Sequence, residues 1–342
     1  MAGEVAAPEA PGARPSAGVA TSGTPAPPAA PRRRWGMWIQ VVVSVVALAG
    51  VVWWASKQSL PELPSAREAA WPLVAALALY TLATLMRGER WLGILTSGGV
   101  DSGRADAYAL TTVGYMGNNA LPARAGDLMK AVISANRAGA PRRDAFGALV
   151  AERLLDVLAL ALIFAVLVLA GGLPLGLSPA LLAAIGAGLA IAGVAVVALT
   201  PRLRGLLAAL LAPSRAMLSA KGAALLVLSL ALWVAEGAVY AILGHVSGLS
   251  LSLADGLYVM ALANIAAMVP AAPGYVGTYD AAVLLAVRLV GGGAKTVALP
   301  YVVLVRFVLF VPIAVVGLVF LVARYGGLRT LRAARAAEVP AA

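Results

Sequence analysis

The chain has 342 residues, of which 61% are hydrophobic and only 12% are charged, and its formal net charge is +11. A soluble domain carries about 25% charged residues, so this composition excludes an ordinary water-soluble globular fold. The chain has no cysteine, which excludes disulfides, thiolate catalysis and cysteine-bound metals. The Lys and Arg residues lie in short clusters between apolar runs, as the positive-inside rule produces in membrane proteins, so we expect no nucleic acid partner.

The apolar runs predict helices that cross a membrane. Residues 1–34 are rich in Ala, Pro and Gly and end in three arginines, so we expect a disordered cytoplasmic tail. Residues 35–325 form the predicted transmembrane domain, and residues 326–342 a basic cytoplasmic tail. A bilayer core is crossed by about 20 apolar residues. Six runs predict full spans: Met37–Ala55, Trp71–Met86, Ala145–Ala170, Ala180–Thr200, Ala223–Leu243 and Val297–Ala323. The first could instead be a signal peptide, but it stays apolar beyond Ala49, which favours a retained helix.

Two further regions are apolar but interrupted, namely region A at about Ala105–Ser134 and region B at about Leu253–Val290. Each contains an Asn, then a Pro, then a Gly, then an acid that starts a new apolar stretch. Proline ends a helix, glycine permits the turn, and the acid favours the positive end of the next helix. Broken backbone at membrane depth is tolerated only inside protein or around a water-filled cavity. We therefore expect two broken or re-entrant hairpins, the kind of element from which transporters build substrate sites.

The two regions share a spacing. Asp127 precedes Arg153 by 26 residues, and Asp280 precedes Arg306 by the same number. Trp71–Ala170 would then repeat as Ala223–Ala323, and the loop charges orient the two blocks in opposite senses. Such an inverted repeat is typical of transporters. Chance is the alternative, because Pro and Gly are common in membrane helices.

The loop charges also orient the predicted spans. Arg87, Arg90 and Arg104 are interpreted as a cytoplasmic loop before region A, which then enters from the cytoplasm, whereas region B enters from outside. Both termini are predicted to be cytoplasmic. The aromatic residues fall mostly near the predicted span ends, where we expect them to act as interfacial anchors.

Several charges lie inside predicted spans. On one helix, Asp156 follows Glu152 by four residues and Arg153 by three, so its side chain can meet both. Glu236 and Arg306 lie in otherwise apolar spans. Each such charge costs about 2.5–3.5 kcal/mol to insert, so it must pair or line a cavity. A structural ion pair, for example between Arg153 and Asp156, is the alternative to a functional role.

Three segments resemble a known family in their order and spacing: Leu121–Asp127, Glu152–Asp156 and Pro270–Gly277. Over about Trp38 to Ala323 the chain resembles the transmembrane domain of lysylphosphatidylglycerol synthase/flippase proteins. The resemblance implies a flippase-like domain that handles an anionic or modified lipid. In that family the synthase activity lies in a separate soluble domain, so we expect no enzyme activity here. Asp127 stands where the family usually has Glu, and the displaced acid Asp280 leaves its role open.

The sequence thus predicts an all-α polytopic protein of the cell membrane that translocates or presents an anionic, aminoacylated or isoprenoid-linked lipid. Arg124, Arg153 and Arg306 are predicted to bind a lipid phosphate or sugar-phosphate, with Asn118 and Asn264 as hydrogen-bond donors. The acids would balance these charges, and one could carry a coupling proton. The predicted substrate-binding set is Asn118, Arg124, Asp127, Glu152, Arg153, Asp156, Asn264, Pro273, Gly274, Gly277, Asp280 and Arg306.

Two alternatives stay open. One is a membrane-embedded transferase acting on a lipid-linked substrate, with Glu152 and Asp156 as acid and base. The other is a partner subunit of a lipid-modifying enzyme. Membrane lipids are the expected partners, and we expect no metal or other cofactor.

Overall fold

The structure is a computed structural model that describes residue 3 and residues 66–121, 124–170, 219–268, 273–290 and 298–327. Within these ranges all the regular structure is helical, which confirms the predicted all-α class. The α-helices are α2 (Ala66–Ser97), α3 (Arg104–Ala120), α4 (Ala125–Ala138), α5 (Arg142–Leu169), α8 (Ala220–Val246), α9 (Leu253–Met268), α10 (Thr278–Leu289) and α11 (Ala298–Arg324), with a short 3-10 helix η3 (Pro273–Tyr275). The predicted spans Met37–Ala55 and Ala180–Thr200, and nearly all of both predicted tails, lie outside the described residues.

The polarity of the bundle suits a membrane. Among the described helices, α2, α8 and α11 are long and apolar enough to cross a bilayer. Large apolar side chains face outward, and Leu169 is 84% exposed, whereas Arg90 in the interior is only 1% exposed. A water-soluble protein would bury its apolar side chains and expose its charges. The inside-out arrangement therefore indicates a lipid environment around the bundle.

Helix α2 corrects the predicted boundary of the second span. The helix continues past Met86 to Ser97, so Arg87 and Arg90 lie inside it and are buried. Their interpretation as cytoplasmic loop charges was wrong. The physical reason is that carboxylates of α8 and α5 pair with them, and such pairing offsets the cost of burying a charge.

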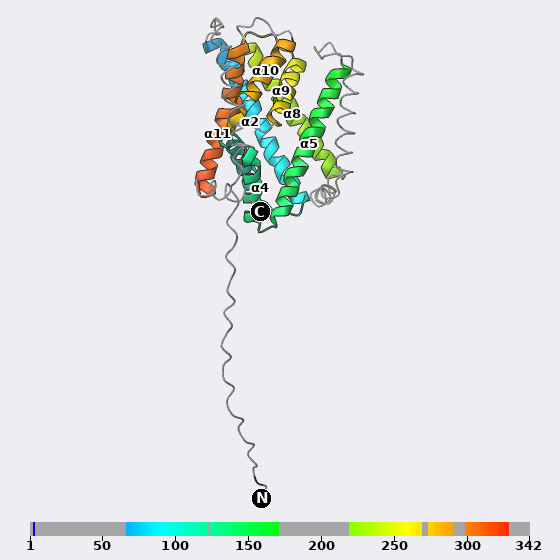
Figure 1. Cartoon of the computed structure of the whole chain (residues 1–342), viewed down its shortest axis with the longest axis vertical. Coiled ribbons are helices and arrows are strands. Elements are labelled where there is room, and N and C mark those ends of the chain that lie inside the picture. Colours follow the sequence, from blue (N-terminus) through cyan, green and yellow to red (C-terminus); the bar gives the residue numbers. More distant parts are fainter. Residues whose placement is uncertain are drawn as a thin grey trace, which may run out of the picture.

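Regions A and B are two opposed helical hairpins. Region A is formed by α3 and α4, and region B by α9, η3 and α10, with the two main helices of each region packed together. In Figure 1, α4 lies at the lower end of the bundle and α10 at the upper end. The tips touch: α3 contacts η3, and a Cβ added to Gly274 would lie 3.5 Å from the carbonyl oxygen of Asn119. The described ends of the two hairpin tips therefore meet each other.

The hairpin of region A depends on close backbone approach. A Cβ on Gly126 would lie 2.0 Å from the carbonyl oxygen of Gly114 and 2.4 Å from the amide nitrogen of Asn118. Only glycine permits α3 and α4 to pack at this distance. The same contact brings the start of α4, which carries Asp127, against the end of α3.

Helix contacts repeat between the two halves of the described chain. Helices α2 and α8 pack against each other, and α2 contacts α3 as α8 contacts α9. The pairs α3–α4, α4–α5 and α3–α11 correspond in the same way to α9–α10, α10–α11 and α9–α5. Helices α2 to α5 thus have the same neighbours, in the same order, as α8 to α11.

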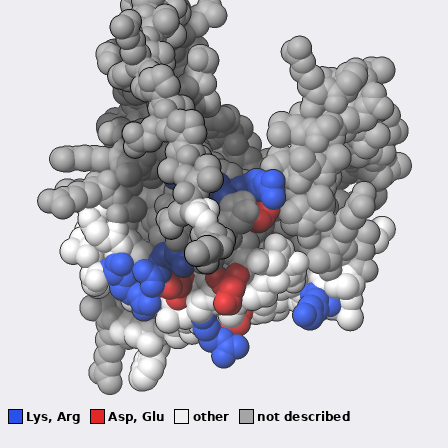
Figure 2. Space-filling view, turned by 90° about the horizontal axis from the view of Figure 1, so that it is seen from below, with Lys and Arg blue, Asp and Glu red and all other residues white. Residues whose placement is uncertain are grey.

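Charged side chains on the surface gather at the lower end. Figure 2 shows Lys and Arg interspersed with Asp and Glu on this face. Asp106 at the start of α3 forms ion pairs with Arg137 of α4, at 2.9 Å, and Arg324 of α11, at 3.1 Å. It also accepts a hydrogen bond from the Tyr325 hydroxyl at 2.7 Å. Burial and this hydrogen bond raise the pKa of Tyr325. Asp106 therefore ties the ends of three helices together.

Candidate functional site

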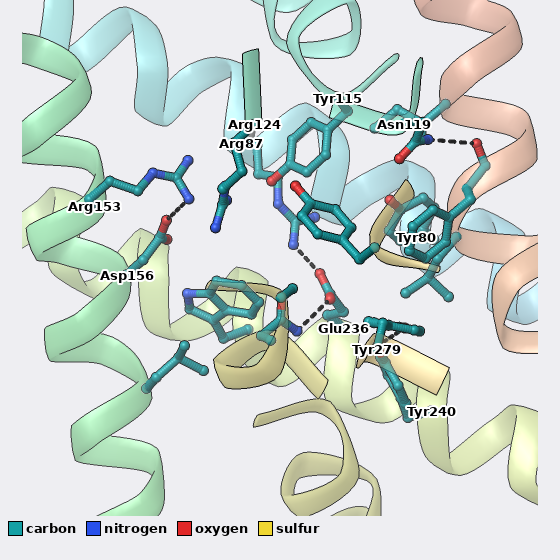
Figure 3. Close-up of a pocket in the computed structure, with 18 residues that line it drawn as sticks. Tyr80, Arg87, Tyr115, Asn119, Arg124, Arg153, Asp156, Glu236, Tyr240 and Tyr279 are labelled. Carbon is teal, nitrogen blue, oxygen red and sulfur yellow. Dashed lines mark hydrogen bonds and ion pairs between the residues drawn. The ribbon is translucent and has the colours of Figure 1, made fainter. Parts of the chain in front are cut away.

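A polar cavity of about 80 Å³ lies where the hairpin tips meet the middle of α2, α5, α8 and α11. Its polar lining comprises Arg87, Asn119, Arg124, Arg153, Asp156, Glu236 and Asn264. In Figure 3 the three arginines are directed toward one region, with Asp156 and Glu236 beside them. Of the predicted set, the structure places Arg124, Arg153, Asp156 and Asn264 in this lining.

Arg87 and Trp233 present donors that have no partner in the described part of the chain. One guanidinium nitrogen of Arg87, Nη2, donates to the Glu236 carboxylate. The other two nitrogens, Nη1 and Nε, are buried without an acceptor, as is Nε1 of Trp233. The Arg87 side chain is only 2% exposed, and it lies over the rings of Tyr115 and Trp233 at 5.5 and 5.4 Å. Buried polar groups are nearly always hydrogen-bonded, so these donors indicate a binding site for an acceptor.

Asn264 supports the Glu236 carboxylate. Its side-chain amide donates to the Met260 carbonyl at 2.9 Å and to Glu236 Oε1 at 3.4 Å. Glu236 thus accepts from both Arg87 and Asn264 within an otherwise apolar helix. The expectation that Glu236 must pair or line a cavity is confirmed in both respects.

Arg153 is shared among three carboxylates. Its guanidinium lies 3.1 Å from Asp156, 3.6 Å from Glu152 and 3.8 Å from Asp127. The pairing with Asp156 was predicted from the helical spacing, whereas the contact with Asp127 comes from the neighbouring helix α4. The two longer distances exceed those of hydrogen bonds. With 30% of its side chain exposed, Arg153 is the most exposed of the paired arginines in the cavity lining.

Behind the cavity lies a buried ion network that the sequence did not reveal. Arg90 donates to Asp156 at 2.6 Å and to Glu152 at 3.4 Å, and Lys130 donates to Glu152 at 2.6 Å. Glu152 does not line the cavity, and its carboxylate is surrounded by cations. The available signal was the three-residue spacing of Arg87 and Arg90, which places both on one face of α2.

At the tip of region A, Asn118 and Asp127 bond reciprocally. The Asn118 amide donates to the Asp127 carboxylate at 3.0 Å, and the Asp127 backbone N–H donates to Asn118 Oδ1 at 3.1 Å. Arg124 Nε approaches the same carboxylate at 3.3 Å. Arg124 has a φ of 58°, so the chain turns through the left-handed region just before α4. Asn118 and Asp127 therefore hold the tip, while Arg124 reaches the cavity.

At the tip of region B, the turn is held by Arg306 and Asp280. Arg306 donates to both carboxylate oxygens of Asp280, with Nη2 at 3.0 Å from Oδ2, and its Nη1 donates to the Gly274 carbonyl at 2.8 Å. Asp280 also accepts from the backbone N–H of Gly277 at 2.9 Å. The structure thus places Arg306 at the tip rather than in the cavity lining. The role of Asp280, left open by the resemblance, is to cap α10 and anchor Arg306.

The glycines of region B set the turn. Gly274 and Gly277 have φ of 65° and 90°, a region that favours glycine. Both lie at the tip, as their place in the motif predicted. The side chain of Pro273, the last predicted site residue, lies outside the described part of the structure.

Aromatic residues also gather around the cavity. Those in its lining are Tyr80, Tyr115, Trp233, Tyr240, Tyr275, Tyr279 and Phe310. The hydroxyls of Tyr240 and Tyr279 share a hydrogen bond. Aromatic faces attract buried cations, and hydroxyl and indole N–H groups remain polar. These rings therefore suit the wall of a buried cationic cavity.

Comparison with known protein families agrees with this architecture. A search among curated proteins gave no match. The model of the family described as the lysylphosphatidylglycerol synthase TM region matches residues 37–317, which is most of the chain. The family is associated with lipid aminoacylation and flipping. The chain therefore belongs to the lysylphosphatidylglycerol synthase TM region family and is a multi-pass integral membrane protein.

Proposed function

We propose that this protein is a flippase-like transporter that moves a lipid with an anionic phosphate headgroup across the cell membrane. The observation that carries the proposal is the unpaired donor set of Arg87 and Trp233, which faces a cavity also lined by Arg124 and Arg153. A phosphate supplies several acceptor oxygens, and arginine binds it with parallel hydrogen bonds.

The balance of interior charges supports a singly charged ligand. Among the described residues, the interior cations are Arg87, Arg90, Arg124, Lys130, Arg153 and Arg306, and the interior acids are Asp127, Glu152, Asp156, Glu236 and Asp280. These form an excess of one positive charge. Because an uncompensated charge at membrane depth is costly, one negative charge from a phosphodiester would complete the site.

The size of the cavity limits what it holds. At about 80 Å³ it is well below the roughly 300–1,000 Å³ of pockets that enclose a drug-sized ligand. It suits a compact headgroup, and the hydrocarbon chains of the lipid would remain outside it.

The repeated contacts support a transport mechanism. We propose that α2–α5 and α8–α11 form an inverted repeat, with regions A and B as re-entrant hairpins from opposite sides of the membrane. The matched neighbours and the matched Asp–Arg tips favour this arrangement. The basic lower end, with Arg137 and Arg324, would face the cytoplasm. Six full spans and two cytoplasmic termini complete the proposed topology.

The ion network favours transport over a membrane-embedded transferase. The transferase alternative needs Glu152 and Asp156 as acid and base. Lys130 and Arg90 engage Glu152, which lies outside the cavity lining, and Asp156 is paired with both Arg90 and Arg153. Carboxylates held in this way are more simply counter-ions of the arginines.

The test is the same substitution at two tryptophans. Trp233 has an unpaired Nε1 at the cavity, whereas Trp91 Nε1 donates to Ser134 at 3.3 Å in the core. Each would be changed to Phe, and translocation of fluorescent phosphatidylglycerol would be measured per folded molecule in phosphatidylcholine liposomes. We expect Trp233→Phe to slow translocation with little loss of stability. Trp91→Phe should lower stability and leave translocation per folded molecule unchanged.

Two results would contradict the proposal. One is the absence of translocation by the wild-type protein above that of empty liposomes. The other is translocation by Trp233→Phe at the wild-type rate, because the donor set would then play no part in binding the headgroup.

A further inference from the structure

A second, apolar depression opens beside the polar cavity. It is a groove of about 220 Å³ between α2 and α11, with α3 as its floor. Tyr80 and Ile313 line both the groove and the polar cavity. The two spaces therefore adjoin at the middle of the bundle.

The threonine hydroxyls along the groove are already satisfied. Thr81, Thr84 and Thr112 each donate to a backbone carbonyl of their own helix, at 2.7, 2.9 and 2.8 Å. Hydroxyls paired in this way no longer require a polar partner. The rest of the wall includes Leu85 and Val316, both exposed at the bundle surface. The groove therefore suits hydrocarbon, in contrast to the donor-rich cavity next to it.

The packing of α3 on α2 forms the floor. A Cβ on Gly88 would lie 2.1 Å from the ring of Tyr108, so the ring packs directly against the backbone of α2. The Tyr108 hydroxyl donates to Glu89 at 2.5 Å, and Glu89 in turn pairs with Arg104 at 2.8 Å. The polar end of Tyr108 is thereby turned to the charged lower end, and its ring remains for the groove.

The length of the groove is close to the thickness of one leaflet. On α11 its lining runs from Pro312 to Phe320, about 12 Å along a helix at 1.5 Å per residue. One leaflet is about 15 Å, half of a bilayer core of about 30 Å. From the cavity the groove proceeds toward the end of α11 that carries Arg324, at the lower end of the bundle in Figure 1.

We infer that this groove binds one hydrocarbon chain of the lipid whose phosphate occupies the polar cavity, so that the lipid enters sideways from the lower leaflet between α2 and α11. The inference rests on the proposed function and extends it. Only the headgroup of the lipid enters the protein, while its hydrocarbon chain stays at the protein–membrane boundary. The position of the groove next to the cavity, with Tyr80 and Ile313 in both linings, and its satisfied threonine hydroxyls select a lipid chain as the occupant.

The experiment uses a photoreactive lipid to locate where the hydrocarbon chain lies on the protein. Phosphatidylcholine liposomes would contain phosphatidylglycerol with a diazirine in the middle of one acyl chain, or diacylglycerol with the same chain. After illumination, adducts are located by peptide mass spectrometry. We expect phosphatidylglycerol adducts to concentrate on the groove residues of α2 and α11, and diacylglycerol adducts to be several-fold fewer there because it has no phosphate for the cavity.

Two neighbouring valines supply matched variants. Val316 lines the groove and is 44% exposed, whereas Val315 is 56% exposed and lies outside the lining. We expect Val316→Trp to fill the groove and to reduce both adduct yield and phosphatidylglycerol translocation several-fold. Val315→Trp carries the same bulk on a different face of the helix and should change neither.

The other outcomes separate failure of the inference from failure of the proposed function. Adducts spread evenly around α11, or equal adducts with diacylglycerol, would make the groove ordinary lipid-facing surface. Cross-linking of residue 316 to residues 37–55 would assign the groove to that segment of the chain. Normal translocation by Val316→Trp would show that the groove does not bind the transported lipid, and it would leave the proposed function intact. Groove adducts without any translocation would instead contradict the proposed function and retain the lipid site.

Discussion

Arg306 holds Asp280 through two hydrogen bonds and the Gly274 carbonyl through a third, whereas Arg153 approaches Asp127, its counterpart at the same spacing, only to 3.8 Å. The two hairpin tips are thus fastened unequally. Region B is locked to α11. Region A is joined to α5 by an arginine that is also shared with other acids. In a transporter with two related halves, such a difference is expected between the closed and the more open side.

The first prediction compares Asp280→Asn with Asp127→Asn. Removing one charge of a buried pair costs about 3–5 kcal/mol, because the partner is left uncompensated. Asp280→Asn should approach this loss, since Arg306 has no second carboxylate within ion-pair distance among the described residues. Asp127→Asn should cost less, because Arg153 retains Glu152 and Asp156, and Arg124 loses only a single contact at 3.3 Å. Reversible unfolding in mixed detergent micelles measures both. Equal losses would show that the tips are fastened alike.

The second prediction concerns the shape of Arg153. Arg153→Lys keeps the charge but loses the planar fork that binds a phosphate by two bonds. The variant should fold, because Arg90 and Lys130 still neutralise the neighbouring acids, yet lose most lipid translocation per folded molecule. Arg153→Ala should be worse in both respects.

Arg306→Lys is the control for this change. Since Arg306 fastens a tip outside the cavity lining, its replacement should lower stability, and translocation should fall only in proportion to folded protein. If well-folded Arg153→Lys translocates lipid at the wild-type rate, Arg153 is a scaffold charge and does not bind phosphate.

The helices and the tips could be predicted from the sequence because their signals are local. Apolar runs marked α2, α5, α8 and α11, and the equal spacing of Asp127–Arg153 and Asp280–Arg306 marked two pairs that do form. The spacing also placed Arg306 near the site, although its partners are Asp280 and Gly274 at the tip of region B.

The cavity itself depends on partners that are distant in the chain. Arg87 was misread as a loop residue because its carboxylate, Glu236, is 149 residues away. Arg90 was misread for the same reason, since Asp156 is 66 residues away. Hydropathy ends a span at the first cluster of charges, and only the packing of α2 against α8 and α5 shows that these charges are buried.

The third prediction tests the orientation. The chain has no cysteine, so single cysteines can be added freely. Ser250 is exposed after α8 at the upper end, and Asn136 is exposed in the last turn of α4 at the lower end. A membrane-impermeant thiol reagent should label Ser250→Cys in intact cells, and Asn136→Cys only after permeabilisation. The reverse labelling would invert the proposed topology.

The last prediction separates the buried network from the cavity. Lys130 and Glu152 are 2% and 1% exposed, lie 2.6 Å apart and do not line the cavity. Lys130→Met alone should cost up to about 3–5 kcal/mol, because it removes one partner of a buried pair. The double variant Lys130→Met/Glu152→Gln restores charge balance with side chains of similar size. It should recover most of that stability, and a double-mutant cycle gives the coupling between the two residues. Translocation per folded molecule should equal that of the wild type, because neither side chain contacts the headgroup. A well-folded double variant that no longer translocates lipid would show instead that Glu152 takes part in transport, as a coupling-proton carrier or as a ligand of a rearranged site.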